Sequence, residues 1–207
     1  MDPIIILAFL VAAGAAYLVL GRSGKSPIAL SASGSAATQV ANQSSLAAAL
    51  PSSAAPYVAF FRASGANYNV DPLLLAAICQ QESAFGTSSL LSQPGPAGTG
   101  DGGHGHGLMQ IDDRWHADWL GANDWTDPAT NIDGGASIFA GDIVQAEALN
   151  LGSDDLTLMA ALSAYNTGSV SGSSVGSAYA NSVWSIYQEY TSAFQAALAS
   201  PATDLTS

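Results

Sequence analysis

The chain has 207 residues, of which 48% are hydrophobic, and this is enough for one globular domain with additional segments. Its 16 acidic and 4 basic side chains give a formal net charge of −12. This excess of carboxylates argues against nucleic acid as a partner, because phosphate binding needs clustered Lys and Arg. The single cysteine, Cys79, excludes an intramolecular disulfide.

The first predicted element is an apolar segment, because residues 3–21 contain no charged side chain. As a helix they would span about 28 Å, close to the roughly 30 Å hydrocarbon core of a bilayer. We therefore expect a transmembrane anchor at residues 1–25. A cleaved signal peptide is the alternative, although the acidic start at Asp2 disfavours it. Arg22 and Lys25 would orient the rest of the chain toward the cytoplasm, but two charges are a weak signal.

Residues 26–55 are rich in Ser, Ala and Gly and predict a linker, in which the stretch from Leu46 to Leu50 could be helical. A globular domain is expected at 56–200, followed by a tail at 201–207. Asp71-Pro72 favours a helix start, and this helix runs through LLLAAICQQES and can end at Gly86. Further helices are predicted at 131–149, 156–165 and 181–198, whereas the LMQI stretch is strand-like or a buried turn. The fold class is therefore α+β and mainly helical.

Glu82 is the first candidate for catalysis. On the helix that begins after Asp71, Leu75, Ile78 and Glu82 lie on one face. Burial on that face and the negative end of the helix dipole would both raise the pKa of the carboxyl group. A glycosidase needs a carboxylic acid that stays protonated near neutral pH. A glutamate at a helix end can also simply extend into solvent, and by itself this is the more common case.

Two aspartates are candidates for a partner of Glu82. Asp101 lies in a Gly-rich loop, and Asp112 follows the GLMQI stretch. With a flexible loop between them, the three acids could converge on one cleft, where one aspartate would activate water. Aspartates in loops are also ordinary turn residues.

The order and spacing of three blocks resemble the goose-type lysozymes and the wider superfamily that includes the soluble lytic transglycosylases. The blocks are ICQQESAFG at 78–86, DGGHGHGLMQIDDRWH at 101–116 and LSAYNTG at 162–168. The resemblance implies a lysozyme-like domain that acts on peptidoglycan, with Glu82 as the acid and Asp101 and Asp112 at the family's aspartate positions. It also implies that four side chains hold the sugar or support the acid, namely Gln110, His116, Tyr165 and Asn166.

The presence of both aspartates favours an inverting muramidase, a lysozyme that hydrolyses the β-1,4 bond between N-acetylmuramic acid and N-acetylglucosamine. A lytic transglycosylase that forms 1,6-anhydro ends is the close alternative, and a non-catalytic wall-binding virion protein is another. No cofactor is expected. A zinc site at His104, His106 and His116 lacks a supporting motif. Besides peptidoglycan, the expected partner is a membrane, either of a virion or the bacterial inner membrane with the domain in the periplasm.

Overall fold

A computed structural model describes residues 44–170 and 174–199. The predicted transmembrane segment and most of the predicted linker lie outside these residues. In the part of the chain that is described, no helix is long and apolar enough to cross a membrane.

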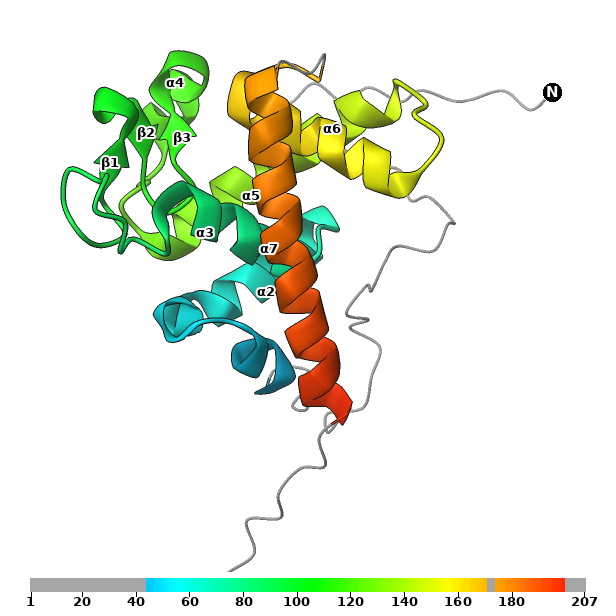
Figure 1. Cartoon of the computed structure of the whole chain (residues 1–207). Coiled ribbons are helices and arrows are strands. Elements are labelled where there is room, and N and C mark those ends of the chain that lie inside the picture. The colour runs from blue at the N-terminus through cyan, green and yellow to red at the C-terminus, as the bar shows by residue number, and fades with distance from the viewer. Residues whose placement is uncertain (1–43, 171–173, 200–207) are drawn as a thin grey trace, which may run out of the picture.

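The described chain is mainly helical, with one very small sheet (Figure 1). A 3₁₀ turn, η1, covers Ser52–Tyr57 and leads into α2 (Val58–Tyr68) and α3 (Pro72–Ser83). The sheet follows, and then come α4 (Asp113–Ala122), α5 (Pro128–Glu147), α6 (Asp154–Thr167) and α7 (Ser174–Ala199). The expected mainly helical α+β class is therefore confirmed.

The sheet has three antiparallel strands in the order β1 (Thr99–Gly100), β2 (Gly105–His106) and β3 (Ile111–Asp112). A second 3₁₀ turn, η2 (Asp101–Gly103), joins β1 to β2. The sheet and α4 form one side of the molecule, at the left of Figure 1, and α3 leads toward them from the helical side. The LMQI stretch contains both structures that its sequence suggested, since Leu108 and Met109 lie in a buried turn and Ile111 begins β3.

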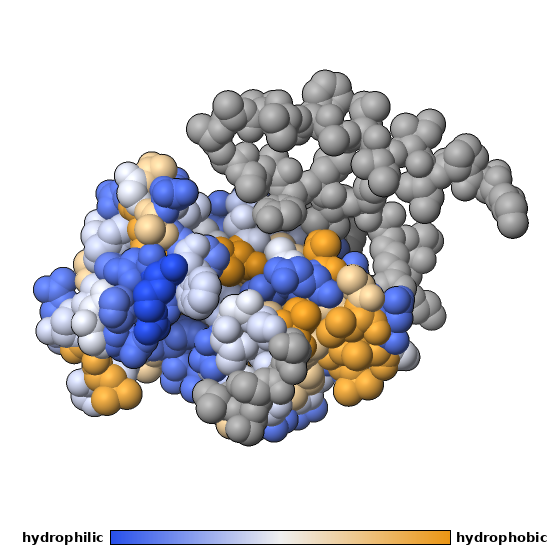
Figure 2. Space-filling view, turned by 90° about the horizontal axis from the view of Figure 1, so that it is seen from above, coloured by the Kyte–Doolittle hydropathy of each residue, from blue (hydrophilic) through white to orange (hydrophobic). Residues whose placement is uncertain are grey.

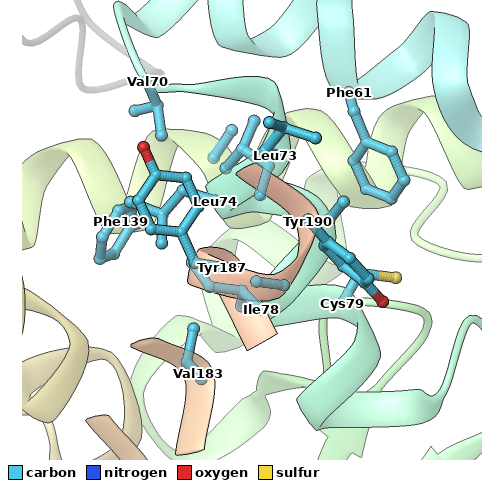
Figure 3. Close-up of a cluster of buried hydrophobic side chains, with 14 of the residues drawn as sticks. Phe61, Val70, Leu73, Leu74, Ile78, Cys79, Phe139, Val183, Tyr187 and Tyr190 are labelled. Carbon is cyan, nitrogen blue, oxygen red and sulfur yellow. The ribbon is translucent and has the colours of Figure 1, made fainter. Parts of the chain in front are cut away.

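Helix α3 is the centre of the core, and almost every side chain from Leu73 to Cys79 is completely buried. Side chains from α2, α5 and α7 surround it, as the close-up of Phe61, Phe139 and Tyr187 shows (Figure 3). Asp71 caps its first turn, because the carboxylate accepts a hydrogen bond from the Leu73 amide at 2.8 Å. The helix ends at Ser83, three residues before the expected Gly86, and its C-cap Ala84 has a left-handed backbone conformation.

The folded part begins before residue 56, where the sequence placed the end of the linker. Residues 44–49 are helical, and Leu46 is completely buried in the core. The Ser- and Ala-rich composition resembles a linker, but its few leucines are enough to bury one face of a short helix against the domain.

Helix α7 also begins earlier than expected, at Ser174 instead of residue 181. Gly176 disfavours a helix by its intrinsic propensity. In the folded chain, however, a Cβ atom at this position would lie 2.2 Å from Oγ of Ser163 on α6. The close approach of α6 and α7 therefore requires glycine here, and packing between the helices offsets the unfavourable propensity.

Candidate active site

Glu82 lies in the last turn of α3, with its side chain at the edge of the core and partly exposed. Burial raises the pKa of this carboxyl to about 7. The expectation of a raised pKa is thus met, and burial is its main cause. The buried helix α3 brings the carboxyl to the point where the core meets the surface.

Tyr179 on α7 is the hydrogen-bond partner of Glu82. Its hydroxyl donates to Oε1 of the carboxyl at 2.5 Å, across 97 residues of sequence. This bond stabilises the anion and acts against the effect of burial on the pKa of Glu82. The bond to Tyr179 is made by Oε1 of the carboxyl and not by Oε2.

Tyr165 on α6 completes a group that we call the acid site, made of Glu82, Tyr165 and Tyr179. Burial raises the pKa of Tyr165 well above its ordinary value, and the negative charge of Glu82 adds to the effect. The Tyr165 hydroxyl donates to the Met109 carbonyl at 2.9 Å. This hydrogen bond joins Tyr165 of the AYN block to Met109 of the GLMQI block, next to Glu82.

Ser83 ties the end of α3 to the sheet side of the domain. Its buried hydroxyl donates to the Leu108 carbonyl at 2.7 Å and accepts a hydrogen bond from the Gly86 amide at 3.1 Å. The residue after the acid thus holds the turn that precedes β3. The sequence alone did not indicate this role of Ser83, although Ser83 directly follows Glu82 in the first block.

Asn131 on α5 holds the same turn from the opposite side. Its buried side chain accepts a hydrogen bond from the Met109 amide at 2.8 Å and donates one to the His106 carbonyl at 3.0 Å. A Cβ atom on Gly107, which has a positive φ of 77°, would lie 2.3 Å from the Asn131 amide nitrogen. The glycine of the GLMQI block is therefore needed both for its conformation and for its lack of a side chain.

Asp101 and Asp112 come together, but around Arg114. The guanidinium bonds to Oδ2 of Asp101 and, through its Nε, to both oxygens of Asp112 at 2.9 and 3.0 Å. Asp112 also caps α4 by accepting from the Arg114 amide, and these bonds hold its pKa below the ordinary value. The sequence motifs do not identify Arg114 as a site residue, because nothing local shows which carboxylates it meets.

The electrostatic surroundings of Glu82 and of Asp112 are different. Burial and Tyr179 determine the pKa of Glu82, whereas Arg114 and His104 act on Asp112. The aspartates lie on the side of the sheet and α4, where the surface is mainly hydrophilic (Figure 2, left). Glu82 can therefore hold its proton near neutral pH, whereas Asp101 and Asp112 form ion pairs with Arg114.

The remaining predicted site residues, Gln110, His116 and Asn166, differ in their burial and contacts. Gln110 turns back into its own loop, where its amide donates to the Gly107 and Gly98 carbonyls at 2.6 and 3.2 Å. His116 is half-buried on α4, and burial lowers its pKa. Asn166 is exposed at the end of α6. Gln110 thus supports the sheet in this structure.

The histidines of the Gly-rich loop pair with an aspartate. Nδ1 of His104 and Nε2 of His106 lie 2.8 and 3.3 Å from the two carboxylate oxygens of Asp113. Across residues 44–170 and 174–199, no group of three or more His, Cys, Asp or Glu side chains is placed to hold a metal ion.

Removing the Tyr179 hydroxyl should raise the pKa of Glu82 further. In Tyr179→Phe the anion loses its donor while burial remains, so we expect an upward shift of about 0.5–1 pH unit from the present value near 7. Carbon-detected NMR titration of the Glu82 carboxyl measures it. Tyr187→Phe is the matched control, because this hydroxyl donates to Asp71 instead. An unchanged or lower pKa in Tyr179→Phe would contradict the assigned contact.

Part of the chain matches a known protein family. Residues 59–186 match the family model described as the transglycosylase SLT domain. No curated protein matches the chain. The matched range runs from the start of α2 into α7 and includes Glu82, Tyr165, Tyr179 and the two aspartates bound by Arg114.

Proposed function

This chain belongs to the transglycosylase SLT domain family of peptidoglycan-acting enzymes, and we propose that it is a lytic transglycosylase with Glu82 as its catalytic acid and base. The observation that carries the proposal is the acid site itself. It holds one carboxyl with a pKa of about 7, a hydrogen bond from Tyr179, and surroundings separate from the aspartates.

In the first step, the protonated Glu82 donates its proton to the glycosidic oxygen between N-acetylmuramic acid and N-acetylglucosamine. The bond from C1 to that oxygen breaks, and positive charge develops on the muramic acid ring. The proton leaves with the N-acetylglucosamine hydroxyl, and Glu82 becomes an anion that Tyr179 stabilises. A pKa close to neutral suits a group that must give up a proton at neutral pH.

In the second step, the Glu82 anion accepts the proton of the 6-hydroxyl group of the same muramic acid. The 6-oxygen bonds to C1 and a 1,6-anhydro ring forms. Glu82 is protonated again, and no water is consumed. Because the nucleophile belongs to the substrate, this route needs no second carboxylate to activate water.

Inverting hydrolysis, which the sequence favoured, needs an aspartate that can accept a proton from water. In this structure Arg114 binds both Asp101 and Asp112, and the lowered pKa of Asp112 makes it a weaker base. The ion pairs therefore support the transglycosylase over the muramidase.

Product masses test the proposal. Full-length protein is incubated with purified peptidoglycan, and the released muropeptides are analysed by mass spectrometry. We expect muramic acid ends lighter by one water molecule than hydrolysed ends. Hydrolysed ends would overturn the transglycosylase and support the muramidase, and no release at all would overturn both.

Asp101→Asn distinguishes the two routes independently. Asp101 is exposed, and its contact in the structure is with Arg114, so we expect activity within about threefold of the wild type, as for an ordinary surface substitution. Loss of a catalytic base should instead reduce the rate about 10²–10⁴-fold. A reduction of that size, measured by muropeptide release, would contradict the single-acid mechanism.

A further inference from the structure

The four tryptophans differ in their surroundings. Trp119 packs against α5, where it contacts Gly134 so closely that a Cβ atom there would clash with the indole. Trp125 and Trp184 pack edge-on or tilted against His106 and Tyr187, with ring centroids 4.8 and 5.4 Å apart. Trp115 on α4, in contrast, is 71% exposed. Contacts with neighbouring side chains or helices thus account for three of these indoles but not for the largely exposed Trp115.

Trp115 extends toward the end of α6. Its indole Cε2 lies 3.9 Å from the position that a Cβ atom on Gly168 would occupy. Gly168 is the C-cap of α6, three residues after Tyr165 of the acid site. The exposed indole of α4 therefore lies beside the C-terminal end of α6, the helix that carries Tyr165 of the acid site.

The backbone that carries Trp115 is held firmly on its N-terminal side. Asp112 caps α4, and the Arg114 guanidinium is bound by two carboxylates. Directly after Trp115 the helix is interrupted at His116, whose backbone is non-helical. The backbone of Trp115 thus belongs to a short, anchored turn, so little backbone freedom is lost when a ligand contacts the indole.

We propose that Trp115 is a stacking platform for a sugar ring of the glycan strand, forming a binding subsite next to the acid site. The inference rests on the proposed function, since it takes the substrate to be a chain of N-acetylated hexoses. The chemical fit is that one face of a pyranose ring presents C–H groups, which pack favourably on an aromatic ring whose face carries negative charge density.

The charge of the protein points to the same kind of contact. A chain with a net charge of −12 cannot attract its substrate through a basic surface. N-acetylglucosamine rings carry no charge, and an N-acetylmuramic acid freed of its peptide carries a carboxylate that an acidic protein does not attract, so hydrogen bonds and apolar contact should supply the affinity. Covering a large exposed indole supplies apolar contact without any charge.

Calorimetry with an inactive variant tests the platform. Glycan strands freed of their peptides by an amidase are titrated into full-length Glu82→Gln and into the same variant carrying Trp115→Ala. We expect Trp115→Ala to weaken binding about tenfold, and Trp115→Phe to retain most of the affinity because the ring remains. Leu156→Ala is the control, since this side chain is 54% exposed at the far end of α6.

The active enzyme gives a second readout. Trp115→Ala should raise KM on the same strands about tenfold and change kcat less than about twofold, because stacking holds substrate and transition state alike. An affinity within twofold of the parent, or a loss shared equally by Leu156→Ala, overturns the platform. If the wild type does not cleave strands but Trp115→Ala still weakens their binding, the proposed function fails while the platform stands. If the wild type cleaves strands and Trp115→Ala has no effect on binding or KM, the platform fails while the proposed function stands.

Discussion

Glu82→Gln is expected to abolish peptidoglycan cleavage while leaving the fold intact. Glutamine has nearly the same shape and can still accept the hydrogen bond from Tyr179, but it has no proton to give to the glycosidic oxygen. General acid–base catalysis contributes about 10²–10⁴-fold to a rate, and here one group serves in both steps, so the loss should reach at least the upper end of that range. The measurement is muropeptide release, with circular dichroism to verify folding.

The same variant should change how stability depends on pH. The pKa of Glu82 is raised in the folded state from 4.5 to about 7. Between these values the folded state therefore holds a proton that the unfolded state has lost, so stability falls as the pH rises through this window and levels off above 7. Removing the group should raise the free energy of unfolding at pH 8 by on the order of 2–3 kcal/mol, with no gain at pH 4.

Asp142 provides an internal comparison for that measurement. This buried carboxyl on α5 also has a pKa raised to about 7 by burial, and it remains in the Glu82→Gln variant. Stability of the variant should therefore still fall between pH 4 and 7, but less steeply than in the wild type. Retained cleavage by Glu82→Gln would mean that Glu82 is not the catalytic acid. An unchanged slope with pH would mean that the pKa of Glu82 is not raised in the folded state.

Asn131→Ala is expected to destabilise the domain strongly. It leaves the Met109 amide and the His106 carbonyl without their partner and opens a void in the core. Unsatisfied buried polar groups cost about 1–3 kcal/mol each, so the free energy of unfolding should fall by about 2–4 kcal/mol. For a domain of this size the melting temperature should fall by about 5–15 °C, measured by thermal unfolding.

Asn123→Ala is the matched control for Asn131→Ala. Asn123 is exposed and donates one hydrogen bond to the Trp119 carbonyl at 2.8 Å. Its replacement should cost less than about 1 kcal/mol, as is usual for surface positions. Equal losses for the two variants would contradict the role of Asn131 as the anchor between α5 and the turn before β3.

Much of the fold follows from local rules that the sequence displays. Asp71-Pro72 predicts the start of α3 because capping depends on a few adjacent residues. The apolar run after it predicts a buried helix, and counting along that helix places Glu82 in the last turn. The three sequence blocks likewise indicate the family, which the match over residues 59–186 confirms. These features depend on neighbours in sequence, so local patterns are enough to find them.

Which distant groups meet is visible only in the folded chain. Tyr179 reaches Glu82 from a helix whose first turns were not predicted, since Gly176 is stabilised in that helix by packing against Ser163. Arg114 binds both aspartates through side-chain geometry that spacing does not reveal. The candidate acid, its helix and the family can therefore be inferred from the amino-acid order alone. The partners of the acid and the ion pairing of the aspartates depend on long-range contacts, which no local pattern encodes.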